Sequence, residues 1–491
     1  MTRSPIELVD TTTRDGNQSL WGATGLTTPD VVSIAPVLDR VGYRALDFTS
    51  STHMAVSVRF HHEDPWERIR LMREAMPRTL LTFLTTGMRF ISWEPADEDV
   101  IRLALRLVMR NGIRRVQIAD PMNDPRALEQ SARLAKQEGA EEVVIGLTYS
   151  VSEVHDDQHY AVRAAAVAAM PEVDRLYLKD PGGLLTVDRV RELAPLFLDA
   201  FAGRPVELHS HCTIGLAPLV YVEGASLGFG TLHTAVAPLA NGTSQPSTES
   251  TLRNLEASGF THSVDPEALQ IVSEHFRQLA VDRGLPVGTP AEYDVGYYHH
   301  QLPGGVVTTM RRQLEEMRRP ELFAESIEEI GRVRADFGYP IVVTPYAQFL
   351  VTQAVMNVMA LHRGDERYTD VPDEIVRYFL GHFGEPPAPP APEVADRVLS
   401  LPRAAELRKV EPLSLEGARA RFGERISDEE LLLRLTMPAE QVDAMAAGAP
   451  AARAPGQRGP LVTLLLGLER RPEVTYLSLV KGDTNVLWRR G

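Results

Sequence analysis

Eight short apolar runs alternate with helical stretches over the first 290 or so residues, and this alternation constrains the fold more than any other feature. The runs have the length of β-strands and lie at 6–12, 45–50, 79–86, 113–119, 142–150, 175–179, 205–211 and 231–239. Stretches with helical patterning separate most of them, at 29–41, 98–111, 125–138, 158–170, 187–202 and 247–258. Strands that alternate with helices form parallel sheets, and eight such units close a barrel. We therefore predict an α/β fold with a TIM (β/α)8 barrel.

The pattern changes after about residue 290, so we divide the chain into a barrel domain, 1–290, and a mainly helical region with a C-terminal extension, 291–491. Amphipathic helices are predicted for 307–336 and 345–362, with a β-like segment at 341–345 between them. Three further features are a Pro-rich linker, a low-complexity segment and two short strands around a Lys-Gly-Asp turn, at 385–393, 445–460 and 474–489.

Composition bounds the class of function. The net charge of −15 argues against nucleic acid or an anionic membrane surface as a partner. The sequence has no run of 18 apolar residues and no N-terminal signal pattern, so we expect no membrane span. Its single cysteine, Cys212, rules out an internal disulfide and fits a reducing compartment. We expect a cytoplasmic protein.

Metal-binding residue types stand at the ends of three of the strand-like runs. His209 and His211 lie two residues apart, so on a strand they point to the same face. Asp15 follows the first run and offers an oxygen ligand, and Lys179 offers a fourth ligand if it is carbamylated. Active sites of TIM barrels lie at the carboxyl ends of the strands, where these residues fall. Two imidazoles and two oxygens suit zinc, with cobalt or manganese as alternatives.

Lys179 is informative because lysine is rare in this chain. The basic residues are nearly all arginine, and the lysines are Lys136, Lys179, Lys409 and Lys481. Lys179 ends a strand-like run and is followed by Asp-Pro-Gly-Gly. The alternative is an ordinary strand-end lysine in a salt bridge with Asp180.

The sequence resembles the carboxyltransferase family of biotin-dependent enzymes, which includes the carboxyltransferase domain of pyruvate carboxylase, the oxaloacetate decarboxylase alpha subunit and the transcarboxylase 5S subunit. The matching segments are DTTTRDGNQSL (10–20), VSVRFHHEDPWERIRLMREAMP (56–77), LKDPGGLL (178–185), HSHCTIG (209–215), TSQPS (243–247), HQLPGG (300–305) and VTPYAQFLVTQAVMNV (343–358). They run in family order as far as about residue 360. The resemblance implies a TIM barrel followed by a helical, funnel-like region.

The resemblance also implies roles for individual residues. Arg14 and Gln18 match residues that contact the 2-oxo acid and its enolate, and Thr344 matches the threonine that relays a proton between substrate and biotin. The alternative for Thr344 is a plain helix N-cap before 346–358. The matched metal ligands are Asp15, carbamylated Lys179, His209 and His211.

Three positions depart from the family pattern. Thr86 stands where the family has an arginine that grips the substrate carboxylate, and Arg89, three residues on, is the candidate to compensate. A hydroxyl does not replace a bidentate arginine–carboxylate pair without loss of affinity. Cys212 and Ala237 stand where the family has acidic residues, and we interpret Cys212 as a buried filler.

From these residues we predict a metal-dependent carboxyltransferase that moves a carboxyl group between biotin and an enolisable 2-oxo acid of the pyruvate or oxaloacetate kind. One alternative is a metal-dependent aldol or Claisen enzyme of the same barrel superfamily, which would lack the metal-binding lysine and the VTP and HQLPGG segments. Another is a catalytically silent paralogue with a role in assembly, as the departures at Thr86, Cys212 and Ala237 would allow.

Biotin is expected on a separate carrier protein. In this family biotin is attached to a lysine between two methionines, and none of the four lysines here has a methionine neighbour. No Gly-rich ATP-binding region precedes the barrel in this sequence. The predicted partners are therefore a biotin carboxyl carrier protein in trans, a small oxo acid and a second copy of the chain in a homodimer.

Overall fold

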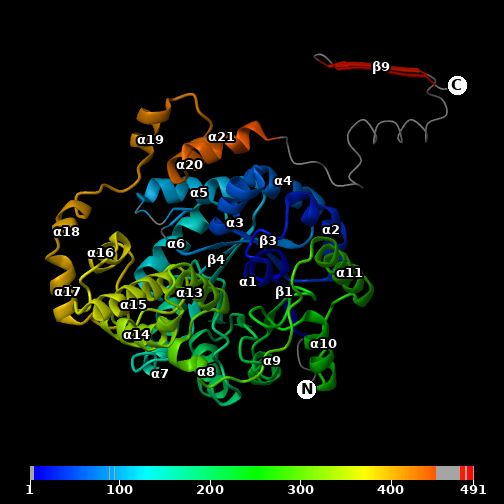
Figure 1. The fold of residues 1–491 in the computed structure, drawn as a ribbon. Coiled ribbons are helices and arrows are strands. Elements are labelled where there is room, and N and C mark those ends of the chain that lie inside the picture. Colours follow the sequence, from blue (N-terminus) through cyan, green and yellow to red (C-terminus); the bar gives the residue numbers. More distant parts are fainter. Residues whose placement is uncertain are drawn as a thin grey trace.

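The computed structural model describes residues 5–448 except 88, 93 and 95, together with 476–481 and 484–489. Its centre is a closed barrel of parallel strands in the order β1 to β8, with β8 pairing back to β1 (Figure 1). This confirms the predicted TIM barrel. The strands are β1 (Glu7–Asp10), β2 (Ala45–Ser50), β3 (Leu80–Thr85), β4 (Arg115–Ile118), β5 (Glu142–Thr148), β6 (Arg175–Asp180), β7 (Val206–Ser210) and β8 (Thr231–Thr234).

Helices follow the strands and surround the barrel (Figure 1). Several begin at side-chain caps that the sequence supplies. Asp124, for example, accepts a hydrogen bond from the backbone N–H of Arg126, 3.0 Å away, just before Pro125 opens α6. The helices of this part are η1 (Thr12–Gly16), α1 (Asn17–Trp21), α2 (Thr28–Val41), α3 (Ser51–Val56), η2 (Ser57–His61), α4 (Pro65–Ala75), α5 (Glu98–Asn111), α6 (Pro125–Gln137), α7 (Asp157–Ala168), α8 (Val187–Ala200), α9 (Ala217–Leu227), α10 (Thr248–Ala257) and α11 (Pro266–Arg283).

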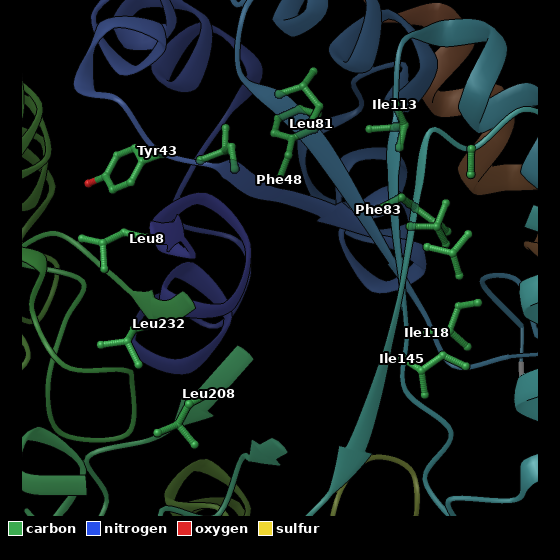
Figure 2. Packing of buried hydrophobic residues seen from close by; sticks show 14 of the residues in the cluster. Leu8, Tyr43, Phe48, Leu81, Phe83, Ile113, Ile118, Ile145, Leu208 and Leu232 are labelled. Carbon is green, nitrogen blue, oxygen red and sulfur yellow. The ribbon is translucent and has the colours of Figure 1, made fainter. Parts of the chain in front are cut away.

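The barrel has an apolar core with a charged layer inside it. Leu8, Phe48 and Leu81 are among the apolar side chains that pack between the strands and the helices (Figure 2). Inside the barrel, fully buried Arg115 bonds Glu142 through Nε at 2.7 Å and Glu207 through Nη2 at 2.6 Å. Burying charge is tolerated here because each ion has a bonded partner of opposite sign.

A second hydrophobic cluster forms among the helices that follow, and it contains Leu302, Ile330 and Leu350. The predicted helix 307–336 is two helices separated by a short turn, η3, and the β-like 341–345 is not a strand but the bend that leads into α15. Val342 packs its side chain into the helical cluster instead of pairing with another strand. These helices are α12 (Tyr297–His300), α13 (Gly304–Glu316), η3 (Pro320–Leu322), α14 (Phe323–Asp336), α15 (Tyr346–Arg363), α16 (Asp373–Phe379), α17 (Pro392–Leu399) and α18 (Pro402–Leu407).

The chain then returns to the barrel with α19 (Leu415–Phe422), α20 (Asp428–Thr436) and α21 (Ala439–Ala447), drawn in orange beside α4 and α5 in Figure 1. Glu429 of α20 bonds Arg70 at 3.1 Å and Asn111 at 3.0 Å. The region after residue 290 thus contacts the barrel at more than one place, and the domain boundary at 290 stays a prediction.

The two terminal strands, β9 (Tyr476–Lys481) and β10 (Thr484–Arg489), form the predicted antiparallel pair. Their turn, residues 482–483, and most of the low-complexity segment 445–460 lie outside the described residues.

In the part of the chain that the structure describes, no helix combines the length and the apolar character that crossing a membrane requires.

Candidate functional site

A cleft of about 630 Å³ opens at the carboxyl ends of the barrel strands. Residues of the barrel loops form one wall, and Val306 and Thr309 of α13 together with Gln348 of α15 form the other. The cleft brings together eight of the nine residues that the sequence singled out, namely Arg14, Asp15, Gln18, Thr86, Arg89, Lys179, His211 and Thr344. The ninth, His209, is 1% exposed and lies behind His211.

Arg14 and Asp15 lie on η1, the single turn that follows β1. The turn fits closely against the loop after β8. The approach is so close that a Cβ atom at Gly16 would lie only 2.9 Å from the carbonyl oxygen of Leu239. Glycine at this position lets the backbone approach, and the approach turns both charged side chains into the end of the barrel.

The turn after β6 holds the ends of β6 and β7 together. The carboxylate of Asp180 accepts hydrogen bonds from the backbone N–H of Leu184 and Leu185, each at 2.9 Å, and from the hydroxyl of Ser210 at 2.7 Å. Gly183 has φ of +68°, and a Cβ there would meet the carbonyl oxygen of His211 at 2.5 Å. Asp180 and Gly183 of the DPGG sequence therefore hold the end of β6, and with it Lys179, beside β7. Because Asp180 uses its carboxylate in this turn, a salt bridge to Lys179 does not explain the lysine.

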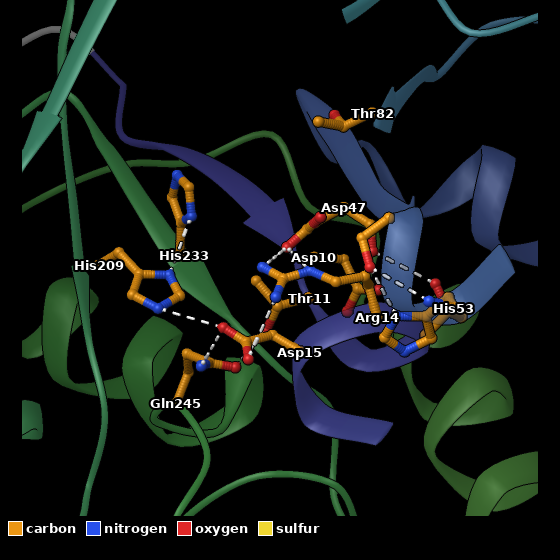
Figure 3. Close-up of polar contacts among 12 residues, drawn as sticks. Asp10, Thr11, Arg14, Asp15, Asp47, His53, Thr82, His209, His233 and Gln245 are labelled. Carbon is orange, nitrogen blue, oxygen red and sulfur yellow. Dashed lines mark hydrogen bonds and ion pairs between the residues drawn. The ribbon is translucent and has the colours of Figure 1, made fainter. Parts of the chain in front are cut away.

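Three ligand atoms, from Asp15, His209 and His211, converge at the floor of the cleft (Figure 3 shows Asp15 and His209). The Nε2 atoms of His209 and His211 lie 3.1 Å apart, and each lies 3.3 Å from Oδ2 of Asp15. A tetrahedral zinc with bonds of 2.0–2.1 Å separates its ligand atoms by roughly 3.3–3.4 Å. The triangle therefore has the size of one face of such a site, and the donor set fits a divalent metal.

The protonation of these ligands also suits a metal. Nδ1 of His211 lies 2.6 Å from the carbonyl oxygen of Thr243, to which it must donate, so in a neutral ring the lone pair is on Nε2, the atom that faces Asp15. Burial lowers the pKa of His209 well below the ordinary value, which keeps that ring neutral. Burial raises the pKa of Asp15, but Arg14 and His211 outweigh it and hold this pKa well below the ordinary value, so Asp15 is a carboxylate.

Lys179 is the register partner of His209 on the neighbouring strand, so the two side chains leave the sheet side by side. Burial, together with the positive charge of Arg14, lowers the pKa of Lys179 to about 8, although Asp15 opposes this shift. A neutral amine is the form that reacts with CO2, and the lowered pKa makes that form accessible near neutral pH. The environment of Lys179 thus fits the predicted carbamate.

Arg14 is held in place by two carboxylates. Its Nε donates to Oδ2 of Asp47 at 2.8 Å, its Nη2 bonds the same oxygen, and its Nη1 lies 3.3 Å from Asp15 (Figure 3). Burial lowers the pKa of Arg14, but Asp15 and Asp47 raise this pKa by more than burial lowers it, so the guanidinium stays charged.

Gln18 and Thr344 are exposed and stand on the open side of the cleft. The interpretation of Thr344 as a plain N-cap is wrong, because α15 begins after Pro345 and has no side-chain cap.

Thr86 lines the cleft, as the substrate-binding prediction requires, but Arg89 is already engaged. Nη2 of Arg89 bonds the carbonyl oxygen of His382, and its guanidinium lies 5.5 Å from the ring centre of Phe383. A guanidinium bound in this way does not reach a substrate carboxylate unless it gives up these contacts. Arg89 therefore does not stand in for the missing arginine in this conformation.

The two other positions that depart from the family pattern, Cys212 and Ala237, have no charged group. Cys212 is 2% exposed, burial raises the pKa of its thiol to about 12, and its backbone N–H donates to Ser244 at 2.7 Å. These properties confirm that it is a buried filler. Ala237 is half-buried in the loop after β8, where it presents a methyl group in place of a charge.

Three residues of this region escaped sequence reasoning, namely Asp47, His233 and Gln245. Nε2 of Gln245 lies 3.0 Å from Oδ2 of Asp15 (Figure 3) and 2.8 Å from Nε2 of His211. Gln245 lies within the TSQPS segment, so a role could have been sought there. Asp47 and His233 sit inside apolar strands, where a buried ionisable residue is itself a signal.

Comparison with known proteins places the chain in a family. It is 34% identical over 397 residues to a pyruvate carboxylase subunit of Methanocaldococcus jannaschii, covering 80% of this chain and 68% of that one. The chain belongs to the biotin-dependent carboxyltransferase family. It is also 30% identical over 451 residues to the 2-oxoglutarate carboxylase large subunit of Hydrogenobacter thermophilus, covering 90% and 68% of the two chains. A family model described as a conserved carboxylase domain matches residues 297–471.

The fold has a solved counterpart. The carboxyl transferase domain of Rhizobium etli pyruvate carboxylase superposes with a TM-score of 0.80 at 22% identity, over 99% of this chain and 84% of that domain. Against a longer chain of the same enzyme, this chain spans 44% of the length. The carboxyltransferase barrel and its helical extension are thus the part that this protein shares with its relatives. Members of this family are enzymes, and this chain is one of them.

Proposed function

We propose that this protein is a metal-dependent carboxyltransferase that moves a carboxyl group between a biotin carrier and an enolisable 2-oxo acid. The observation that carries the proposal is one cleft in which Arg14, Asp15, Lys179 and His211 face Thr344. The names of the relatives support the substrate class, since pyruvate and 2-oxoglutarate are both 2-oxo acids.

Asp15, His209, His211 and a carbamylated Lys179 would hold one divalent ion, and zinc suits this set best. When bound, such an ion draws charge from a neighbouring carbonyl oxygen and so favours loss of the α proton. The chain's own contribution is Arg14, whose guanidinium stays charged and fixed against Asp47, ready to bind the enolate oxygen.

Thr344 would move the proton. Carboxybiotin, when present in the cleft, would supply CO2 and leave a ring nitrogen that needs a proton. The hydroxyl of Thr344 would take the proton from the α carbon of the oxo acid and pass its own to that nitrogen, and the enolate carbon would then bond CO2. A hydroxyl does this without leaving a net charge on the protein.

The carrier and the oligomer remain part of the proposal. A relative named as one subunit of a pyruvate carboxylase is consistent with a biotin carrier that is a separate protein, and we expect its biotin to enter between the barrel loops and α13. We also retain the homodimer and the cytoplasmic location as predictions.

A carrier-dependence assay tests the function. The purified protein is given oxaloacetate or pyruvate, with carboxybiotinyl carrier or free biotin at high concentration, and carboxyl transfer and α-deuterium exchange are followed. Transfer should require the carrier and stop with avidin, whereas avidin presaturated with biotin should have no effect. Turnover that ignores avidin in the absence of carrier would instead favour an aldol or Claisen enzyme.

A further inference from the structure

Behind His209 a chain of hydrogen bonds leads away from the cleft into the barrel. Glu207 and His209 lie two residues apart on β7 and point into the barrel, and His233 lies on β8 beside them. Nδ1 of His209 is 3.2 Å from Nδ1 of His233, and Nε2 of His233 is 2.7 Å from Oε2 of Glu207 (Figure 3 shows the two histidines). All three residues are at most 1% exposed. Neither Glu207 nor His233 touches the cleft, so the proposed reaction leaves them unused.

Glu207 fixes the direction in which these hydrogen bonds run. Its carboxylate accepts from Arg115 at 2.6 and 2.8 Å and from Arg175 at 3.0 Å, so it is ionised and only accepts. Nε2 of His233 must therefore carry the hydrogen that it donates to Glu207. In a neutral ring, Nδ1 of His233 is then an acceptor, and it takes the hydrogen of Nδ1 of His209. This leaves the lone pair of His209 on Nε2, which faces Asp15 and His211.

We propose that Glu207 and His233 are positioning residues, which lock His209 in the tautomer and ring orientation that binds the metal. The inference rests on the proposed metal site. It contrasts with His211, whose Nδ1 is fixed directly by the carbonyl oxygen of Thr243. Partners of this kind set the basicity and aim of a ligating histidine, and their loss weakens metal binding by about 10–100-fold.

Two substitutions at His233 separate hydrogen bonding from packing. His233→Phe keeps an aromatic ring but neither donates nor accepts, and His233→Gln supplies one acceptor and one donor without the ring. Tyr177 provides the matched control, because its ring stacks on His233 with centroids 5.3 Å apart. Tyr177→Phe keeps this packing and removes a hydroxyl that takes no part in the chain of hydrogen bonds.

Zinc affinity is measured by competition with a chromophoric chelator, and the visible spectrum of the cobalt-loaded protein reports the ligand geometry. We expect His233→Phe to bind zinc about 10–100-fold more weakly with an altered cobalt spectrum, His233→Gln to recover most of the affinity, and Tyr177→Phe to match wild type. His233→Ala replaces the phenylalanine variant if that protein does not fold.

Wild-type affinity in His233→Phe, or equal losses in the phenylalanine and glutamine variants, overturns the positioning role and leaves the proposed function standing. A wild-type protein that binds neither zinc nor cobalt overturns the metal site itself, and with it the proposed function.

Discussion

Both Nε and Nη2 of Arg14 donate to the same carboxylate oxygen, Oδ2 of Asp47. Asp47 is completely buried on β2, so this pair fixes the guanidinium at the edge of the cleft from inside the barrel wall. The remaining nitrogen of Arg14, Nη1, is left to face Asp15. The arrangement explains how a residue on a short turn keeps one orientation, which stabilisation of a developing charge requires.

Asp47→Asn should therefore cost both stability and activity. Removing one partner of a buried ion pair is strongly destabilising, and Arg14 would keep only the longer contact with Asp15, so we expect the free energy of unfolding to fall by about 3 kcal/mol in urea titrations. Glu274→Gln is the matched control, since Glu274 pairs with Arg277 on the surface and should contribute little. If the two variants lost similar amounts of unfolding free energy, the buried pair would contribute no more to stability than a surface pair.

Metal content tests the ligand set. Protein purified without chelators should hold about one zinc per chain, as expected for a site with four protein ligands. Lys179→Ala should lose metal and activity, and Lys179→Arg should not restore them, because a guanidinium does not form a carbamate. Lys136→Arg, which alters a surface lysine paired with Asp174, should leave both unchanged. Full activity in metal-free protein would contradict the proposed site.

Because Thr86 stands where the family has an arginine, we expect the protein to bind pyruvate weakly. Thr86→Arg should bind pyruvate about 10-fold more tightly, since hydrogen bonds between charged groups contribute about 1.5–3 kcal/mol. Binding calorimetry measures the change, and Thr86→Val, which keeps the size without the hydroxyl, should show no gain. If wild type already binds pyruvate as tightly as the arginine variant, Thr86 is not the position that limits recognition.

Much of the barrel and its site follows from local sequence patterns. Strand and helix periodicity predicts the order of the elements. In a parallel barrel this order alone places Asp15, Lys179 and His211 at the end of the barrel where the carboxyl ends of the strands meet. The bond from Arg89 to His382 could not be predicted in this way, because it joins residues 293 positions apart. The conformation of Val342 could not be predicted either. Its segment has a β-like sequence, but its side chain packs among the helices and the segment forms no strand.

His155 should make stability depend on pH. Burial lowers its pKa to about 2, with His159 and Arg334 adding to the shift, whereas in the unfolded chain it takes up a proton near 6.5. Its contribution is thus fully present above pH 6.5 and is lost as pH falls, because the unfolded state then binds one proton more. Between pH 6 and 4, wild type should lose about 1.4 kcal/mol per pH unit more than His155→Phe. Parallel pH profiles of the two proteins would contradict the buried neutral histidine.

Thr344 offers a test of proton transfer apart from metal binding. Thr344→Ala should lower carboxyl transfer by about 100-fold or more, a typical contribution of a group that carries a proton. Its zinc content should stay at the wild-type level, because Thr344 is not among the residues whose ligand atoms converge. Thr344→Ser keeps the hydroxyl and should retain most of the activity. Thr352→Ala, an exposed threonine further along α15 and outside the cleft, is the control and should transfer like wild type. Transfer at the wild-type rate in Thr344→Ala would mean that another group, or water, carries the proton.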